Sequence, residues 1–124
     1  MKAEYGNWNE SKWQPVREGI DRVVLGLTAE TMSCTVAECK SGNEVKPHSH
    51  PNEQIAIILQ GTCDYYVDGT PYAMKPGSWI VVPANVEHYI HVYDSKEPVL
   101  NLDIFAPNRP EYTESFKKFL SQQE

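Results

Sequence analysis

The sequence has no apolar run long enough to cross a lipid bilayer. Its longest uninterrupted apolar segment is Ile55 to Leu59, whereas a membrane-spanning helix needs about 20 residues. Residues 1–10 are mainly polar and lack the apolar segment of a secretion signal. We therefore expect a soluble, cytoplasmic protein without a membrane partner.

Basic residues are also few. The chain has 11 Lys and Arg residues against 17 Asp and Glu residues, which gives a net charge of -6, and no run of Lys or Arg stands out. Contacts to phosphate groups require a basic surface. Nucleic acid is therefore not an expected partner.

Cysteine is scarce, and its spacing suggests no crosslink. Cys34, Cys39 and Cys63 are odd in number and include no C-x-x-C pair, which argues against a disulfide framework and against a zinc knuckle. We expect buried, reduced thiols. A chain of 124 residues buries roughly two thirds of the surface that its unfolded state exposes, so residues 1–124 are expected to form one domain without such crosslinks.

What the sequence does contain is a series of short strand-like segments. Turn signals recur roughly every 8–12 residues through the middle of the chain, which is typical of an all-β sandwich or barrel. We expect eight or more strands. Those predicted by range are Met32–Cys39, Gln54–Leu59, Thr62–Val67, Pro71–Met74, Trp79–Val82, Val86–Tyr93 and Val99–Phe105.

The two ends of the chain differ from this pattern. Residues 111–124 are predicted to form a helix, because apolar residues recur there on one stripe that should dock on the barrel wall. The stripe consists of Tyr112, Phe116, Phe119 and Leu120. Residues 1–14 are predicted to form an arm whose aromatic side chains pack on the domain or on a neighbouring subunit. These side chains are Tyr5, Trp8 and Trp13.

Histidine carries the clearest chemical signal. His48 and His50 form an H-x-H pair, and residues i and i+2 of an extended chain project to the same face, so both imidazoles can converge on one point. The pair belongs to a longer pattern, G-x5-H-x-H-x3-Q-x6-G, that runs from Gly42 to Gly61. A second pattern, G-x5-P-A-N-x2-H, ends at His88.

In order and separation, these two patterns resemble the two motifs of the cupin superfamily. The resemblance implies a small antiparallel β-barrel of the jelly-roll kind, in agreement with the strand spacing. It also implies a metal site made by His48, His50, His88 and one further residue of the first motif.

The further ligand is Glu in most cupins, whereas this chain has Gln54 at that position with Glu53 beside it. Gln54 keeps the motif's spacing to both His50 and Gly61, and Glu53 keeps neither, so Gln54 is favoured as the ligand. The second motif has Asn85 where Gly is usual, which is tolerable because Asn accepts a positive φ. Its final Asn is replaced by Val92.

Such a ligand set would leave the metal ion its full charge. Three neutral imidazoles and one amide oxygen contribute no negative charge, which favours a Lewis-acid site for anionic or hydroxyl-bearing substrates. We expect one divalent transition metal ion per chain, Ni, Zn, Mn or Fe.

The last predicted strand leaves two arrangements open. Its alternating sets are Asn101, Asp103 and Phe105 on one side, and Leu100, Leu102 and Ile104 on the other. An apolar set normally forms the core face, which by itself would put Asp103 on the surface. The sequence L-D-x-F-x-P-x-R, from Leu102 to Arg109, favours the opposite arrangement.

With Gln54 and this sequence, the chain resembles the pectin-degradation cupins of the KdgF type. That resemblance runs from about Trp13 to Tyr112. It implies that an acid at Asp103 acts on the substrate, and that Phe105 and Arg109 shape the pocket. The implied reaction converts cyclic 4,5-unsaturated monouronates from pectin or alginate to open-chain keto forms. The substrate carboxylate would be held by Arg109 or by the metal ion.

Two other functions stay open. An iron cupin dioxygenase also needs three histidines and an open metal site, and it would consume oxygen. A non-catalytic sugar- or metal-binding cupin is the third reading. For any of them a homodimer is expected, because the aromatic arm and the open sheet edges need cover.

Overall fold

The computed structural model describes residues 2–123. Residues 1 and 124, at the ends of the predicted arm and helix, lie outside the described residues. The strands are β1 (Gln14–Arg17), β2 (Ile20–Leu25), β3 (Ser33–Cys39), β4 (Glu53–Gln60), β5 (Cys63–Val67), β6 (Thr70–Met74), β7 (Trp79–Val82), β8 (His88–His91) and β9 (Val99–Ala106). The helices are the short 3-10 helix η1 (Trp8–Glu10) and α1 (Pro110–Ser121).

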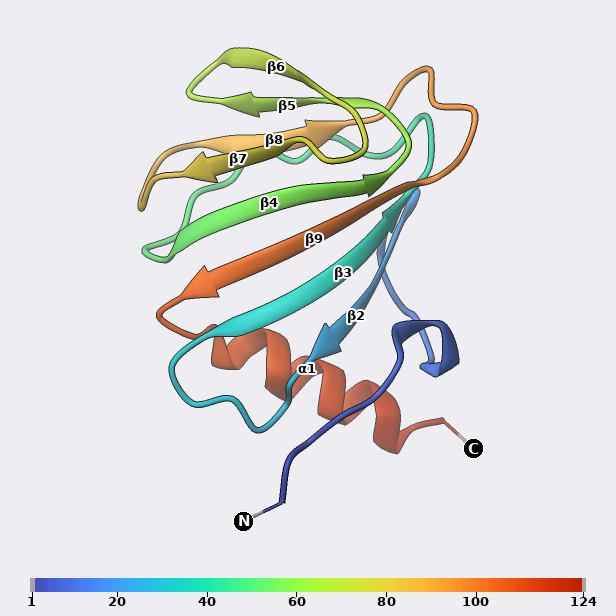
Figure 1. Ribbon diagram of the computed structural model, residues 1–124, viewed down its shortest axis with the longest axis vertical. Coiled ribbons are helices and arrows are strands. Elements are labelled where there is room, and N and C mark those ends of the chain that lie inside the picture. The colour runs from blue at the N-terminus through green and yellow to red at the C-terminus, as the bar shows by residue number, and fades with distance from the viewer. Residues whose placement is uncertain (1, 124) are drawn as a thin grey trace.

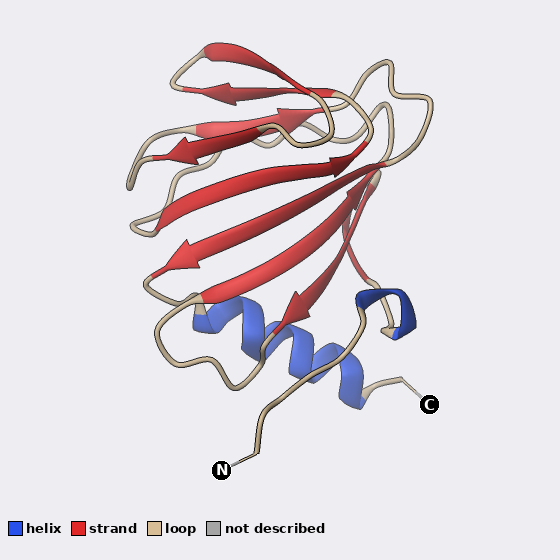
Figure 2. Ribbon diagram, viewed as in Figure 1, coloured by secondary structure: helices blue, strands red, loops and turns tan. Residues whose placement is uncertain are grey.

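The strands form two antiparallel sheets that pack face to face (Figures 1 and 2). The larger sheet has the order β1-β2-β3-β9-β4-β7, and the smaller has the order β6-β5-β8. One cluster of buried side chains fills the space between them. Its members include Cys39, Ala56, Ile58, Tyr65, Val82, Val92 and Val99. The predicted all-β barrel with a C-terminal helix is confirmed.

Two strands were not predicted by range. β1 contains Pro15, which is usual at a sheet edge but is not a strand signal. β2 reads IDRVVL, and because Arg22 points inward while Asp21 points outward, neither face has the apolar alternation that marks a strand. The other seven strands lie where they were predicted, with β8 four residues shorter at His88–His91.

Four turn residues of the motifs adopt positive φ, and Asn85 and Gly61 are two of them. Asn85 has φ of 64°, which confirms that Asn can take the place of the usual Gly there. Gly61 has φ of 80°, and a Cβ atom at this position would lie 2.8 Å from Ser95 Oγ and 2.9 Å from Val99 Cγ2. Gly61 therefore permits both the turn and the close approach of the following loop.

The C-terminal helix docks on the barrel wall as predicted. In Figure 1 α1 lies beside β2, and Phe116 packs with Val23 and Val24 in a second buried cluster. The predicted stripe residues Tyr112, Phe119 and Leu120 pack against the same cluster. Within residues 2–123, no helix is both long and apolar enough to pass through a membrane.

The N-terminal arm packs on its own domain. The carboxylate of Glu4 accepts hydrogen bonds from the backbone N–H groups of Leu27 and Thr28 at 2.9 and 2.8 Å. Trp8 and Trp13 pack against the cluster around Phe116. Tyr5 is 97% exposed, so it does not pack on the domain, and its packing on a neighbouring subunit stays a prediction. The two tryptophans of the arm are thus covered by the chain itself.

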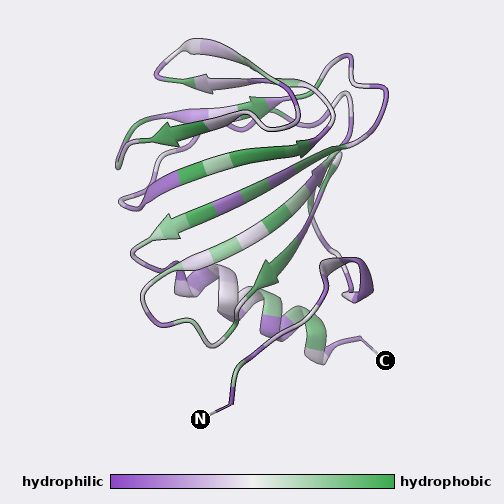
Figure 3. Ribbon diagram, viewed as in Figure 1, coloured by the Kyte–Doolittle hydropathy of each residue, from purple (hydrophilic) through white to green (hydrophobic). Residues whose placement is uncertain are grey.

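The outer face of the larger sheet is apolar. Inward side chains on β4 are buried, whereas Ile55 and Leu59 on its other face are exposed, as are Trp79 and Val81 on β7. Ile55 pairs with both Val81 of β7 and Ile104 of β9, so these side chains lie next to one another. Figure 3 shows the hydrophobic residues along these strands. We call this surface, formed by Ile55, Leu59, Trp79 and Val81, the apolar outer face.

All three cysteines are free. Cys39 and Cys63 are buried, as predicted, and Cys34 is partly exposed. Burial raises the pKa of the Cys63 thiol to about 12, and the nearby Asp64 carboxylate adds to this effect. The thiol is thus protonated at neutral pH and is not a nucleophile.

Candidate active site

The backbone brings the three motif histidines together. His48 and His88 form an isolated antiparallel bridge in which each N–H donates to the carbonyl of the other, at 3.2 and 2.9 Å. Their ring centroids are 4.3 Å apart. His50 lies two residues further on the same face, and its carbonyl accepts from the N–H of Asn85 at 2.7 Å. One ligand atom from each of the three rings lies within 4.8 Å of the others.

Hydrogen bonds fix the tautomer of each imidazole. Every Nδ1 of the triad lies next to a backbone carbonyl two residues away. The carbonyls belong to Lys46, Asn52 and Val86, at 2.7, 3.0 and 2.8 Å for His48, His50 and His88 respectively. A carbonyl can only accept, so each Nδ1 carries the proton and each Nε2 keeps a free lone pair.

Burial keeps these imidazoles neutral. It lowers the pKa of His48 and of His50 below the usual value, and it lowers the pKa of His88 to about 4. The charge of Arg109 contributes to each of these shifts in the same direction. Neutral imidazole is the form that binds a metal ion.

The amide of Gln54 lies against the triad. Its Nε2 donates to Asp103 Oδ1 at 2.8 Å and to the Tyr65 hydroxyl at 3.0 Å, which directs its Oε1 toward His50 Nε2 at 3.0 Å. Because the proton of His50 is on Nδ1, two lone pairs face each other across this contact. Such a contact is unfavourable between the two residues alone, and a cation bound by both atoms would relieve it.

A second observation also fits a metal ion. His88 Nε2 is buried, and it has no hydrogen-bond partner within residues 2–123. Glu53, the alternative ligand, is exposed on the opposite face of β4 from Gln54. The geometry therefore favours three imidazole nitrogens and the Gln54 oxygen, a donor set that suits a divalent first-row ion.

Asp103 faces the interior of the barrel. Asn101 and Phe105, on the same face of β9, are buried, so the polar set lies inside and the apolar set outside. The carboxylate accepts from Gln54 Nε2 and, at 2.9 Å, from Asn101 Nδ2. Burial raises the pKa of Asp103 to about 6, and these two hydrogen bonds act in the opposite direction. Of the two arrangements left open by the alternation, the structure has the one that the L-D-x-F sequence favoured.

A cavity of about 70 Å³ adjoins the triad inside the barrel. Four of the residues singled out from the sequence line it, namely His48, Gln54, Asp103 and Phe105. It has room for about two water molecules at roughly 30 Å³ each. Sequence reasoning did not predict that several other residues line a site, which are Arg17, Arg22, Tyr65, Asn101 and Tyr112.

The aromatic residue and the arginine of the L-D-x-F-x-P-x-R sequence lie next to each other, and only the aromatic residue lines the cavity. The Phe105 ring packs edge-on against His50 and Tyr112, with centroids 5.5 Å apart in both cases. Arg109 lies behind Phe105 and is not among the cavity-lining residues. Its guanidinium donates to Glu111 Oε1 and to the Tyr112 hydroxyl, both at 2.8 Å.

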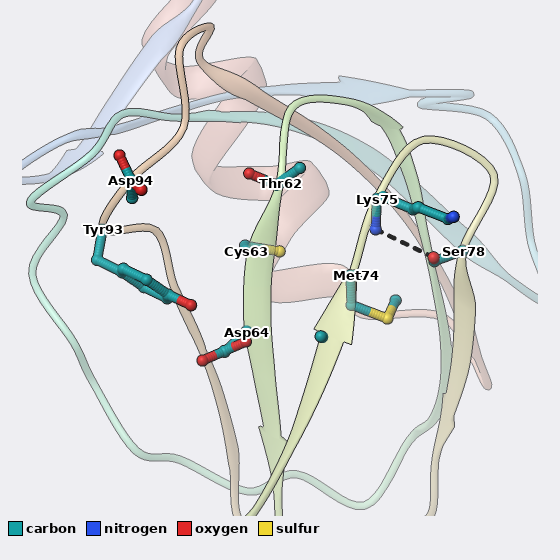
Figure 4. A pocket seen from close by; sticks show the side chains of 9 residues that line it. Thr62, Cys63, Asp64, Met74, Lys75, Ser78, Tyr93 and Asp94 are labelled. Carbon is teal, nitrogen blue, oxygen red and sulfur yellow. Dashed lines mark hydrogen bonds between the residues drawn. The ribbon is translucent and has the colours of Figure 1, made fainter.

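A larger surface pocket lies elsewhere, at one end of the smaller sheet (Figure 4). It has a volume of about 460 Å³, and Cys63, Asp64, Lys75 and Tyr93 are among its lining residues. The sequence-predicted site residues are all absent from its described lining. The converging histidines instead point to the smaller interior cavity as the candidate active site.

Comparison with known proteins agrees with the resemblance of the sequence to cupins. A family model described as a cupin domain matches residues 35–105. The pectin degradation protein KdgF of Dickeya dadantii is 26% identical over 105 residues, which cover 84% of this chain and 93% of that protein. The structure of KdgF from a Halomonas species has a TM-score of 0.76 at 25% identity, covering 84% of this chain and 94% of that one. This likeness confirms the predicted jelly-roll fold.

A second curated relative is an enzyme with a different reaction. The dimethylsulfoniopropionate lyase DddW of Ruegeria pomeroyi is 24% identical over 81 residues, or 65% of this chain. The match covers 50% of DddW, so this chain spans about half the length of that relative. The relatives thus include enzymes of more than one activity.

Proposed function

This chain belongs to the cupin family, and we propose that it is a metal-dependent enzyme that converts 4,5-unsaturated monouronates to their linear keto forms. The observation that carries the proposal is the contact chain from His50 through Gln54 to Asp103, which puts a carboxyl group beside the candidate metal ligands. The similarity to two KdgF proteins over most of their lengths supports the substrate class.

The reaction requires two proton movements and no other reactant. A 4,5-unsaturated uronate is a cyclic enol ether, so loss of the anomeric hydroxyl proton with cleavage of the bond between the anomeric carbon and the ring oxygen gives an aldehyde and an enolate. A proton added at C4 then turns the enolate into the ketone, and the product is an isomer of the substrate. A positioned carboxyl group can accept the first proton and donate the second.

Asp103 is the residue that we assign to these transfers. Its Oδ1 and Oδ2 are held by Gln54 and Asn101, so the carboxyl group keeps one orientation toward the cavity. A divalent ion bound by His48, His50, Gln54 and His88 would supply Lewis-acid polarisation of a substrate oxygen.

The cavity is smaller than a monouronate, so side chains must move when the substrate binds. Tyr112 is the side chain that we expect to move, because it comes from α1, is partly exposed and lines the cavity. Phe105 stays buried beside His50 and excludes water from the triad. Arg109 would position Tyr112 through its hydrogen bond to the hydroxyl.

The proposed activity can be tested with a lyase-generated unsaturated galacturonate. The purified, metal-loaded protein is expected to remove the substrate's absorbance faster than the spontaneous ring opening, with a linear dependence on protein concentration. The same preparation stripped of metal is the control. A metal-loaded protein that leaves the spontaneous rate unchanged would contradict the proposal.

A second candidate function is lyase activity on dimethylsulfoniopropionate, which the match to DddW favours. That substrate combines a sulfonium cation with a carboxylate. Arg17 and Arg22 both line the cavity, and their charges would repel the sulfonium group. Release of dimethyl sulfide from that substrate would replace our proposal with the lyase function. Oxygen uptake by iron-loaded protein would replace it with the dioxygenase function.

We also propose that the protein is a homodimer formed through the apolar outer face. Ile55, Leu59, Trp79 and Val81 are all more than a third exposed on adjacent strands, and a contiguous apolar patch of that kind typically marks an interface. Such a face can pair with its own copy about a two-fold axis.

Light scattering is expected to give twice the 14.1 kDa chain mass, and Trp79→Glu should lower the measured mass to that of one chain. A wild-type mass near 14.1 kDa would rule the dimer out.

The cytoplasmic location of the protein and the single domain over residues 1–124 stay predictions.

A further inference from the structure

Arg22 places a partly buried positive charge on the wall of the cavity. The side chain follows Ile20 on the inward face of β2, and its guanidinium carbon lies 4.0 Å from the centroid of the Tyr112 ring. Its Nε is buried and has no hydrogen-bond partner within residues 2–123. A buried donor without a partner costs free energy. An acceptor from a bound molecule would remove this cost, because the described residues supply none.

Arg109 lies on the other side of the Tyr112 ring, and two of its nitrogen atoms donate hydrogen bonds to residues of the C-terminal helix. Its guanidinium carbon is 3.9 Å from the ring centroid. Two guanidinium groups at such distances cannot share one face, so Tyr112 separates them. Arg109 Nε donates to Glu111 and Nη1 donates to the Tyr112 hydroxyl. Of these two arginines, Arg22 is the one that lines the cavity.

The acidic group that faces Arg22 is not its partner. Among the described residues, Arg22 and Asp103 form no ion pair within 4.0 Å. Burial lowers the pKa of Arg22, the Tyr112 hydroxyl and Asp103 counteract this, and the charge of Arg109 adds to it. Arginine nevertheless remains protonated in proteins, so the cavity carries a fixed cation.

The sheet leaves space between Arg22 and Asp103. Arg22 pairs with Ala37 across β2 and β3, and Thr35 of β3 pairs with Asp103 of β9. Ala37 and Thr35 both line the cavity, and their small side chains form its floor between the two charged groups.

We propose that Arg22 is the anion-binding residue of this cavity, and that its free guanidinium edge receives the carboxylate of a sugar acid whose other end lies at Asp103 and the histidine triad. This inference rests on the proposed function for its substrate. It differs from the expectation that Arg109 or the metal ion holds the carboxylate, because Arg109 does not line the cavity and lies on the far side of the Tyr112 ring.

Steady-state kinetics with unsaturated galacturonate test this role. Arg22→Gln is expected to raise KM roughly 10- to 100-fold, the effect of losing one charge-assisted hydrogen bond, while kcat changes less than threefold. Arg22→Lys should recover part of the loss, since it restores the charge without the planar fork. Metal content and the near-UV circular dichroism spectrum should match those of the wild type. A KM within twofold of wild type in a folded Arg22→Gln protein would overturn the inference.

Equilibrium binding separates this inference from the proposed reaction. Saturated galacturonate carries the carboxylate but not the double bond, and galactose carries neither. Calorimetry is expected to show wild-type protein binding galacturonate at least tenfold more tightly than galactose, and Arg22→Gln should abolish that preference. Preference without turnover of the unsaturated sugar would refute the reaction and leave the anion site standing. Equal binding of both sugars would refute the anion site. So would the absence of binding by either sugar in a titration up to about 10 mM.

Discussion

Replacing His88 with alanine is expected to remove the metal ion from the protein. His88 Nε2 is buried and has no hydrogen-bond partner within the described residues, so its lone pair would be free to bind a metal ion. Loss of one of four ligands should weaken metal retention by roughly 100-fold or more, since even changes to residues behind the ligands cost 10- to 100-fold. Elemental analysis after purification without chelator should find about one divalent ion per wild-type chain and almost none in His88→Ala or His48→Ala.

A pair of neighbouring substitutions distinguishes the fourth ligand. Gln54→Ala removes the amide that lies 3.0 Å from His50 Nε2 and should also lower metal retention. Glu53→Gln changes an exposed side chain on the other face of β4 and should leave metal retention as in wild type. Equal losses in both variants would show that Glu53 takes part in binding. Less than a tenth of an ion per wild-type chain would count against the site as a whole.

Replacing Asp103 with asparagine is expected to remove most of the catalytic rate while the fold and metal content are kept. Asparagine fills the same space on β9, but it cannot accept and return a proton. Proton transfer by a positioned side chain contributes roughly 100- to 10,000-fold to a rate. The loss should appear in kcat and in kcat/KM alike, because the group acts in the transition state.

Asp64→Asn is the matched control for this substitution. Asp64 lies on β5 and lines the surface pocket of Figure 4 rather than the interior cavity, so its loss should change kcat less than twofold. Metal analysis and thermal unfolding of both variants show whether each is folded and loaded. A loss below about tenfold in a folded, metal-loaded Asp103→Asn protein would exclude general acid or base catalysis by this residue.

The part of the fold that the sequence predicts is the part with regular local signals. Gly61 and the Asp68-Gly69 pair mark turns, and the short apolar run of β4 marks a strand between them and the histidine motif, so the middle strands were predicted to within one or two residues. The motif spacing likewise predicted a triad that the bridge between His48 and His88 then brings together. The assignment of Gln54, Asp103, Phe105 and Arg109 to their roles stays a prediction.

The rest depends on long-range packing. No strand was predicted around Arg22, and only the pairing of β2 with β3 and the docking of α1 show that it faces Tyr112 inside the barrel. Its inward position is also why β2 was missed. Tyr5 shows the converse, because an aromatic residue in an arm has no local signal that distinguishes packing from exposure.

The inverted polarity of β9 makes this strand a point of frustration in folding. A slip of one residue would turn Leu102 and Ile104 into the barrel and Asp103 out of it, so hydrophobic burial alone favours the wrong register. Hydrogen bonds outside the strand oppose the slip, since Gln60 Nε2 donates to the carbonyl of Pro98 before β9 and Asn52 Nδ2 to that of Pro107 after it. The native register is thus selected by polar contacts at both ends, and the same alternation that lines the interior cavity with polar groups also places Leu102 and Ile104 on the outer side of the sheet.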